Sequence, residues 1–329
     1  MRAIVIQQYG GPEQLAIKEV PDPEPVPGHV VVDVEAFGLN HAEIYFRQGA
    51  WGDVAKVSGI ECVGTVRSDP AGRFAVGQKV AALMGGMGRT INGSYAERTR
   101  VPAENVVPIE SGLSWEELAA IPESYATAWT CLYRNLALAP GQVVLVRGAT
   151  SALGQAAVNI AVEAGARVIA TTRNPKRVAG LEALGAKQVE LEAPDLAARI
   201  RKLHPRGIDG VLDIVGNSAV LDSLAAVRPD GRVCLAGFLG GAAPIAAFDP
   251  LFHMPSGTHL SFFASAFMFG TPDYPLTDIP FQGMIDRAAA GSYKAKPART
   301  FRFEEIQDAH RLMESSQANG KIVVSVNGK

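Results

Sequence analysis

Hydrophobic and polar positions follow two different rhythms along this chain. Before residue 114, apolar runs are short and end every few residues at Gly or Pro, as in residues 2–7, 15–20 and 30–36. Short strands between such frequent turns predict a compact, barrel-like β domain. From Val143 onwards, apolar strands alternate with segments of helical spacing, which predicts repeated β-α-β units and a parallel sheet covered on both faces.

The second part contains about the six strands that a doubly wound dinucleotide-binding domain requires. We expect strands at residues 143–147, 167–172, 188–191, 210–215, 231–236 and 259–264, and helices at 154–164, 175–184, 195–203 and 218–227. The tail after Pro280 resembles the first part of the chain instead. We therefore expect its strands, near residues 301–303 and 321–326, to pack back on the β domain.

Two helices are expected between the two parts. Ser114 followed by Glu117 is a capping-box pattern, which predicts that a helix starts there. We expect this helix to end at residues 121–122, where Pro disfavours a helical conformation of the residue before it, and a second helix to span residues 125–138.

The clearest chemical motif is the sequence VVLVRGATSALGQAA, which runs from Val143 to Ala157. It predicts a strand, a tight turn at Gly148 and a helix that opens at Gly154. Free N–H groups in the first turn of such a helix suit a phosphate group. The usual dinucleotide fingerprint is G-x-G-x-x-G, and Ser151 stands where its middle glycine is often found. The β-α alternation that follows supports dinucleotide binding, and it leaves open whether Ser151 contacts the cofactor or is only tolerated.

The end of the second expected strand of the parallel sheet indicates which dinucleotide is bound. A carboxylate at this position binds the ribose hydroxyls of NAD and repels a 2′-phosphate, but residues 170–177, ATTRNPKR, contain no acid. Arg173 lies 19 positions after Gly154, where the ribose-reading residue belongs, and Lys176 and Arg177 follow. Because these cationic groups suit a phosphate dianion, the sequence favours NADP(H) over NAD(H). Lys176 also fits a solvated charge at a helix start.

Two glycine-containing segments follow the next expected strands. They are residues 213–216, DIVG, and residues 236–241, AGFLGG. Both fall at the carboxyl edge of the sheet, where open α/β sheets bind ligands. Asp213 fits a helix cap as well as a ligand contact, and the sequence does not choose between these roles.

Composition narrows the classes of protein and of partner. The chain has 329 residues, 47% of them hydrophobic and 19% charged, and a net charge of −2, so we expect no nucleic-acid partner and no acidic membrane surface. Cys62, Cys131 and Cys234 lie far apart, which argues against a disulfide framework or a cysteine-rich zinc site. We see no signal peptide and no apolar run that reaches about 18 residues, and we expect a cytoplasmic, globular protein.

Several motifs occur in the same order along nearly the whole chain. They are Tyr9-Gly-Gly-Pro-Glu13, Gly38-Leu-Asn40 with Tyr45 and Arg47, Gly59-Ile-Glu61, Ala126-Thr-Ala-Trp129, the turn after Val146, Asp213-Ile-Val-Gly216, Ala309-His-Arg-Leu-Met-Glu314 and Gly320-Lys-Ile-Val-Val324. With them the chain resembles the medium-chain dehydrogenase/reductase superfamily, and within it the zinc-independent quinone oxidoreductases related to zeta-crystallin. The resemblance implies a Rossmann doubly wound parallel sheet domain, residues 125–266, inserted between segments 1–124 and 267–329 of a GroES-like β-barrel catalytic domain.

The same resemblance bears on metal binding. Zinc-dependent relatives place a Cys where Asn40 stands, a His where Ile60 stands and a further ligand near Glu123. Asn and Ile do not replace a thiolate and an imidazole as zinc ligands. The four-cysteine structural zinc lobe of those relatives is also absent from the sequence. We therefore expect no metal.

The resemblance places Asn40, Tyr45 and Thr127 around the nicotinamide and the substrate. Asn40 would donate a hydrogen bond to a carbonyl oxygen, Thr127 would bind the nicotinamide amide, and Tyr45 is a possible proton donor. Each also has a structural interpretation, as a turn former, a helix residue and a packed aromatic ring. The full set expected to bind the cofactor is Thr127, Thr150, Ser151, Ala152, Leu153, Gly154, Thr172, Arg173, Arg177, Val215, Gly216, Gly237, Phe238, Leu239, Phe263 and Lys321.

The expected activity is NADPH-dependent reduction of a quinone or an α,β-unsaturated carbonyl compound, because such substrates need no metal. An enoyl or enone reductase of a biosynthetic pathway is the alternative, and an NADPH-binding structural or regulatory protein with little catalysis is a further one. The resemblance also implies a homodimer through the sheet edge near residues 259–264. The chain departs from the family pattern at Ser151 and Ala152, at Glu43, and at Glu192, which lies near a position where many relatives have Tyr.

Overall fold

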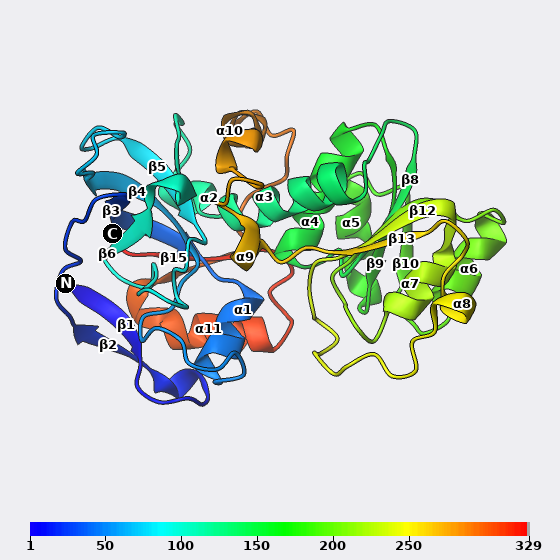
Figure 1. The fold of residues 1–329 in the computed structure, drawn as a ribbon, viewed down its shortest axis with the longest axis horizontal. Coiled ribbons are helices and arrows are strands. Elements are labelled where there is room, and N and C mark those ends of the chain that lie inside the picture. The colour runs from blue at the N-terminus through cyan, green and yellow to red at the C-terminus, as the bar shows by residue number, and fades with distance from the viewer. Residues whose placement is uncertain (328–329) are drawn as a thin grey trace. The chain divides into compact units, whose positions relative to one another are not determined.

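The computed structural model describes residues 1–327 and divides the chain into two compact units (Figure 1). Unit 1 comprises Met1–Glu123 together with the chain from Ser265 onwards, and unit 2 comprises Ser124–Ala264. Among the described residues, no helix has the length and apolar character needed to cross a bilayer.

Unit 1 is built on an antiparallel ribbon and a larger sheet, with short helices at their edges. Its strands are β1 (Arg2–Ile6), β2 (Leu15–Glu19), β3 (His29–Gly38), β4 (Glu61–Ser68), β5 (Lys79–Leu83), β6 (Arg98–Pro102), β7 (Val106–Pro108), β14 (Arg299–Arg302) and β15 (Ile322–Ser325). Its α-helices are α1 (His41–Arg47), α2 (Trp115–Leu118), α9 (Ser265–Met268), α10 (Phe281–Ala289) and α11 (Ile306–Glu314). Strands β1 and β2 pair with each other, and the other strands form a seven-stranded sheet.

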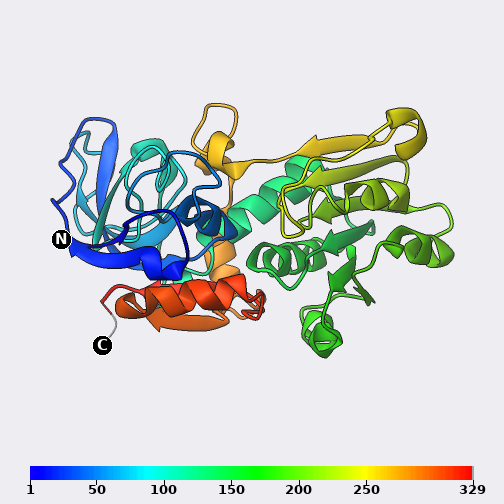
Figure 2. The same ribbon diagram turned by 90° about the horizontal axis from the view of Figure 1, so that it is seen from below.

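Strand β3 organises unit 1, because it pairs with β4, β6 and β15. Its residues Val30, Val32, Val34 and Phe37 are buried in the core of this unit. The predicted return of the tail is confirmed, since β15 runs antiparallel to β3 and β14 lies parallel beside β15. Helix α11 follows β14 and lies against α1 (Figures 1 and 2). Strands β4, β6 and β15, which lie far apart in the sequence, are thereby held against β3.

Unit 2 is a parallel sheet with the strand order β10-β9-β8-β11-β12-β13. Its strands are β8 (Val143–Arg147), β9 (Arg167–Thr172), β10 (Gln188–Leu191), β11 (Ile208–Asp213), β12 (Val227–Leu235) and β13 (His259–Phe262). Its α-helices are α3 (Pro122–Thr130), which begins at the end of unit 1, α4 (Ala152–Glu163), α5 (Val178–Ala183), α6 (Leu196–Leu203), α7 (Val220–Ala226) and α8 (Pro250–His253). The predicted six-stranded, doubly wound sheet is confirmed, and its order is the one typical of dinucleotide-binding domains.

Both faces of this sheet are covered. Leu145 and Val211 pack with residues of α6 and α7, and their neighbours Val144 and Leu212, which point to the opposite face, are also fully buried. The pairing register brings the last residues of the strands to one edge. Arg147 pairs with Asp213, and Thr172 lies opposite Leu191.

Four predicted boundaries are wrong, and three of them belong to the two helices between the parts of the chain. Helix α2 has the predicted capping box on Ser114 but ends at Leu118, and α3 (Pro122–Thr130) begins three residues earlier than expected. Pro suits the first turn of a helix, because no N–H is needed there, so the proline begins this helix. The helix continues as one π-helical segment, Cys131–Asn135, and stops short of residue 138. Strand β12 begins four residues before the predicted residue 231, ahead of Pro229 and the left-handed residue Asp230.

Candidate functional site

The turn between β8 and α4 is closed by Ser151. Its hydroxyl donates to the Gly148 carbonyl oxygen at 2.8 Å and accepts from the Gly154 N–H at 3.0 Å, so Ser151 is the N-cap of α4. An N-cap of this kind satisfies one of the free donors of the first turn. The N–H groups of Ala152 and Leu153, the first two helical positions, have no acceptor within the helix because of their place in it. They remain directed beyond the end of β8, where an anion would meet them.

Gly154 is required by close packing rather than by backbone conformation. A Cβ atom at this position would lie 2.4 Å from the Gly148 carbonyl oxygen and 2.6 Å from the Ala149 Cα atom. Gly148 itself has a φ of +78°, in the left-handed region that favours glycine. The turn therefore needs one glycine, Gly154, for lack of space and the other, Gly148, for its backbone conformation.

The segments after β11 and β12 form a second part of the same edge. The Asp213 carboxylate accepts from the Gly216 N–H at 2.8 Å and from the Ser223 hydroxyl at 2.6 Å. Asp213 is fully buried, so its carboxylate holds its own turn and the start of α7. Burial raises the pKa of Asp213, while the bonds from Gly216 and Ser223 oppose that rise.

Backbone bonds join this turn to the loop that follows β12. The Leu239 N–H donates to the Ile214 carbonyl at 3.0 Å, and the Gly240 N–H donates to Val215 at 2.8 Å. A Cβ atom on Gly216 would lie 2.6 Å from the Gly237 carbonyl oxygen. Five of the predicted cofactor residues are therefore brought together here: Val215, Gly216, Gly237, Phe238 and Leu239. Phe263 follows β13, is buried, and donates its N–H to Leu235.

The end of β9 presents Arg173 to solvent. Thr172 is buried, and its hydroxyl accepts from the Asn174 N–H at 3.1 Å. Asn174 in turn accepts from the Lys176 N–H at 3.0 Å, which caps the short 3-10 helix Pro175–Arg177. Arg173 is exposed, and Arg177 is partly buried one turn further on. The sequence prediction of a cationic group at this strand end agrees with this placement.

In unit 1, two side chains fix the amide of Asn40. Its Nδ2 donates to Glu61 Oε1 at 2.8 Å, and its Oδ1 accepts from the Lys321 Nζ at 2.7 Å. An amide whose oxygen faces an ammonium group and whose nitrogen faces a carboxylate has only one favourable orientation. One Nδ2 hydrogen is used by Glu61, and the second has no acceptor within residues 1–327.

Glu61 is the centre of this cluster. It is fully buried, forms an ion pair with Lys321, and accepts from the Glu123 N–H through Oε2 at 2.8 Å. By the resemblance described above, Asn40 stands at one of the positions where zinc-dependent relatives carry a ligand, and Glu123 lies near another. Within residues 1–327, no three His, Cys, Asp or Glu side chains are grouped so that they could hold a metal ion. Lys321 is a predicted cofactor residue, and the structure places its ammonium group against Asn40 and Glu61.

A second buried network anchors α1, the helix that begins beside Asn40. Glu43 accepts from the Asn40 N–H at 2.6 Å, from the Ile60 N–H at 3.1 Å and from the Tyr95 hydroxyl at 2.9 Å. The Tyr95 oxygen also lies 3.1 Å from His310 Nε2, and Arg47 Nε donates to His310 Nδ1. Since Nδ1 accepts, Nε2 carries the proton, and the bonds run from Arg47 through His310 and Tyr95 to Glu43. This chain of bonds ties α1 to α11.

Burial shifts the pKa of three members of this network, and it raises that of Tyr95 well above its ordinary value. Burial raises the pKa of Glu43 to about 7, and the hydrogen bonds to its carboxylate and the charge of Lys321 oppose that rise. Burial, with the nearby Arg47 charge, lowers the pKa of His310 to about 3. His310 is therefore neutral at ordinary pH, as the bond from Arg47 requires.

Tyr45 and Thr127, the other two residues expected around the substrate, lie on helices. Tyr45 lies on α1, half-buried, with its ring edge-on to His41 at 5.7 Å between centroids. Burial raises the pKa of the Tyr45 phenol, so it keeps its proton. Thr127 lies on α3 in unit 2 and is buried.

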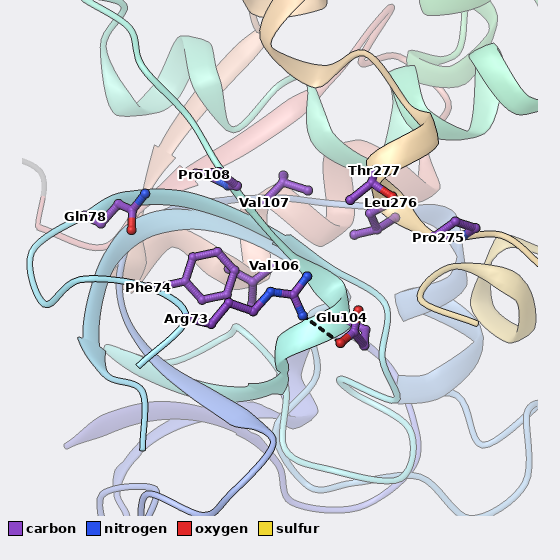
Figure 3. A pocket seen from close by; sticks show the side chains of 10 residues that line it. All are labelled: Arg73, Phe74, Gln78, Glu104, Val106, Val107, Pro108, Pro275, Leu276 and Thr277. Carbon is purple, nitrogen blue, oxygen red and sulfur yellow. Dashed lines mark hydrogen bonds and ion pairs between the residues drawn. The ribbon is translucent and has the colours of Figure 1, made fainter. Parts of the chain in front are cut away.

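Unit 1 also has a pocket of about 310 Å³ that none of the predicted residues lines (Figure 3). Its walls include Phe74, Val106 and Leu276, and an ion pair between Arg73 and Glu104 lies beside it. Both partners of this ion pair are exposed. None of the residues that line the pocket belongs to the Asn40 cluster, so the two sites are separate.

Comparisons with known families agree with this geometry. Residues 26–111 match the family described as alcohol dehydrogenase GroES-like domain, and residues 152–274 match the family described as zinc-binding dehydrogenase. These are the two domains of one superfamily, in the order and with the folds described above. The chain belongs to the medium-chain dehydrogenase/reductase superfamily. Within it, the chain is a member of the zinc-independent quinone oxidoreductase-like family of oxidoreductases.

Curated relatives of this family member differ in length. It is 27% identical to a 2-haloacrylate reductase from Burkholderia sp, over 98% of both chains. It is 28% identical to the quinone oxidoreductase of Lama guanicoe, over 73% of this chain and 74% of that one. It is 30% identical to part of a phenolphthiocerol/phthiocerol polyketide synthase from Mycobacterium tuberculosis, over 98% of this chain. The match spans only 14% of that much longer polypeptide.

Solved structures of this superfamily superpose on the whole chain. A mycobacterial protein in complex with NADPH has a TM-score of 0.87 and 25% identity, covering 99% of this chain and all of that one. A protein described as an NAD-dependent alcohol dehydrogenase has a TM-score of 0.83 and 29% identity, with the same coverage. The fold is therefore shown, while relatives with the same fold differ in the nicotinamide cofactor that their names and complexes indicate.

Several residues that shape these sites carry little signal of their own in the sequence. Glu61 belongs to a motif that does not indicate its partners, and Lys321 is predicted only as a cofactor residue. Tyr95 and His310 come from segments far apart in sequence. One signal is available for Arg147, which ends an apolar strand. Charged residues are rarely buried without a partner, so such a residue predicts a buried ion pair.

The packing of the turn can be tested with Gly154→Ala. Ala normally stabilises a helix relative to Gly, but here its Cβ would collide with the Gly148 backbone. We expect G154A to lower the free energy of unfolding by about 2 kcal/mol, measured by thermal and denaturant unfolding. Gly180→Ala is the matched control, because Gly180 lies in α5 with open space around it. That variant should gain up to about 1 kcal/mol, and equal effects at both positions would contradict the packing account.

The buried Glu43 predicts a pH-dependent difference in stability. Its ordinary pKa is 4.5 and its folded pKa is about 7, so its favourable contribution is present below pH 4.5 and is lost as the pH rises through about 7. Glu43→Gln does not ionise, so its stability relative to the unchanged protein should rise by about 2 kcal/mol between about pH 5 and about pH 8. His310 is present in both proteins, so its contribution cancels from the difference in stability. A difference that stays constant across urea titrations at these pH values would contradict the prediction.

Proposed function

We propose that this protein is an NADPH-dependent, zinc-independent oxidoreductase that transfers a hydride to a quinone or an α,β-unsaturated carbonyl acceptor. The observation that carries the proposal is the Asn40 amide. Lys321 and Glu61 hold it so that one Nδ2 hydrogen has no acceptor within the described residues. A donor fixed in this way can stabilise negative charge on an acceptor oxygen without rearranging during the reaction.

The residues at the edge of the unit 2 sheet fit a dinucleotide. We propose that the N–H groups of Ala152 and Leu153 bind the pyrophosphate and that Arg173, with Arg177, binds the 2′-phosphate. We propose that the glycine-containing segments 215–216 and 237–239 contact the nicotinamide ribose and that Thr127 binds the nicotinamide amide. When bound, NADPH supplies the hydride, and the protein supplies orientation and electrostatics.

The acceptor chemistry follows from the donor set. In a quinone or an enone, conjugation spreads the developing negative charge onto oxygen, where a hydrogen bond from Asn40 would stabilise it. No Lewis acid is needed for such an acceptor. We propose Tyr45 as the proton donor, because it lies on α1, the helix that begins beside Asn40, and carries a phenol O–H. In this mechanism Glu61 and Lys321 act through Asn40 and do not touch the substrate.

An enoyl or enone reductase of a biosynthetic pathway is the second candidate within this class. It is favoured by the match to part of a polyketide synthase, which covers 98% of this chain. A structure described as the CurK enoyl reductase also has the same fold, at 24% identity. The third candidate, an NADPH-binding structural or regulatory protein with little catalysis, makes no use of the Asn40 donor.

We also propose a homodimer formed through β13. This strand is the last in its sheet and, among the described residues, pairs only with β12, so one row of its backbone groups is open to pairing. Leu260 and Phe262 on β13 are exposed, as are Leu251 and Phe252 of α8. A second copy would cover these apolar side chains. Cys62, Cys131 and Cys234 are buried and form no disulfide within residues 1–327, which suits a reducing compartment, and we propose the cytoplasm.

Activity is tested by incubating the protein with NADPH and a panel of quinones, enones and enoyl thioesters. We expect oxidation of NADPH, followed by its absorbance, with at least one acceptor class. The class that gives the highest kcat/KM identifies the acceptor, and preference for the thioesters would favour the second candidate. Tight binding of NADPH without oxidation by any acceptor would instead support the structural or regulatory role.

The 2′-phosphate site is tested with Arg173→Ala. Removing a charge-assisted contact should weaken NADPH binding by about tenfold or more and leave NADH binding unchanged, measured by calorimetric titration. Arg167→Ala is the control, because Arg167 is an exposed arginine at the opposite end of the same strand. If R173A weakens the binding of both cofactors equally, the assignment of Arg173 to the 2′-phosphate is wrong.

A further inference from the structure

Arg147 is a charged residue buried at the last position of β8, directly before the cofactor turn. Only 2% of its side chain is exposed. Its Nε donates to Glu192 Oε1 at 3.1 Å, and its Nη2 forms an ion pair with the same carboxylate. Its Nη1 donates to Asp222 at 2.8 Å, to the Ser223 hydroxyl at 3.0 Å and to the Ala219 carbonyl at 3.1 Å. The guanidinium therefore joins the end of β10 to α7 across the sheet.

Glu192 lies beside the strand end at which an acid would matter most for cofactor choice, the end of β9. It follows β10 directly, and its N–H donates to the Thr172 carbonyl at 2.9 Å. Its backbone is thereby fixed beside the end of β9, next to Arg173. A free carboxylate near this strand end would favour the ribose hydroxyls of NADH and repel a 2′-phosphate.

The Glu192 carboxylate nevertheless makes no ion pair with Arg173. Within residues 1–327, the one cation paired with Glu192 is Arg147, and Arg173 has no carboxylate partner. Asp222 takes part in the same arrangement, since it also accepts from the Ala197 N–H at the start of α6 at 3.1 Å. Arg147 thus draws the Glu192 charge toward the face of the sheet covered by α6 and α7, and Arg173 stays available.

We propose that Arg147 is a positioning residue for cofactor selection: by binding Glu192, it keeps that carboxylate from Arg173 and from the adenosine ribose, and so permits NADPH. The inference rests on the proposed function, because it assumes that the end of β9 receives the 2′-phosphate. Arg147 does not touch the phosphate, since its donors are directed at Glu192 and α7. Without Arg147, Glu192 would pair with Arg173 or bind the ribose hydroxyls.

The test measures dissociation constants of NADPH and NADH by calorimetric titration for the unchanged protein and for three variants: Arg147→Met, Glu192→Gln and the double variant. We expect R147M to lower the preference for NADPH over NADH by on the order of tenfold. E192Q alone should change the preference little, because its charge is already neutralised. The double variant should restore the original preference, which a purely structural role of Arg147 would not do.

Two controls keep the result interpretable. Arg228→Met removes a cation paired with Asp209 in the same sheet, at 2.8 Å, and should not change the preference. R147M leaves Glu192 and Asp222 without their cation and can therefore prevent folding. In that case Arg147→Lys replaces it. The shorter ammonium group does not reproduce the guanidinium bonds to both Glu192 and α7, and the shift should again be reversed by E192Q.

The outcomes separate this inference from the function on which it rests. An unchanged protein that binds NADH more tightly than NADPH would overturn the cofactor assignment itself. A second outcome is that the unchanged protein prefers NADPH while a folded R147M or R147K variant shows the same preference. That result would overturn the role of Arg147 and leave the cofactor assignment intact. A shift that E192Q does not reverse would also overturn it, because Glu192 would then not be the group that Arg147 controls.

Discussion

The buried ion pair between Lys321 and Glu61 is the interaction on which the arrangement of unit 1 depends. Removing two charges from water is costly, and such a pair contributes little net stability compared with apolar packing. The pair does, however, require that the tail of the chain return to β3, because Lys321 directly precedes β15. It also orients Asn40, since the amide lies between the carboxylate and the ammonium group. Its main consequence is the direction of one hydrogen-bond donor.

Unit 2 uses a buried cation in a similar way. Arg147 has its charge balanced by Glu192 and Asp222, and it sets where a carboxylate points beside the cofactor edge. In both units, breaking the pair by removing one partner would leave an uncompensated buried charge. The cations are thus costly to place and costly to remove, which fits residues that position functional groups. The family's β-α framework carries the rest of the stability through its apolar strands.

Much of the fold is predictable because it depends on local patterns. The alternation after Val143 predicts the parallel sheet, and the likeness of the tail to the first part of the chain predicts its return to the β domain. Errors occur where one residue type fits both the end and the start of a helix. The sequence predicts that a helix ends at Pro122, whereas this residue begins α3. The sequence leaves the role of Ser151 open, and the structure makes it the N-cap of α4.

The site is less predictable, because its connections run between distant elements. Nothing in the sequence near Asn40 indicates that Glu61 and Lys321 determine the direction of its amide. Glu192 stands out only as a departure from the family pattern, and its partner Arg147 lies 45 residues away. Such pairs form through tertiary packing, which no spacing rule along one chain describes. Motifs therefore identify the family, and the structure identifies the residues that position its groups.

The central claim is that a hydrogen bond from Asn40, and not a metal ion, stabilises the reduced acceptor. The most direct measurement is the rate of NADPH oxidation with the preferred acceptor after dialysis against a strong chelator, for the unchanged protein and Asn40→Ala. The account predicts full activity of the unchanged protein after chelation. It also predicts a fall in kcat of about a hundredfold in N40A, with the affinity for NADPH retained. Loss of activity on chelation that returns with added zinc, or unchanged kcat in N40A, would contradict it.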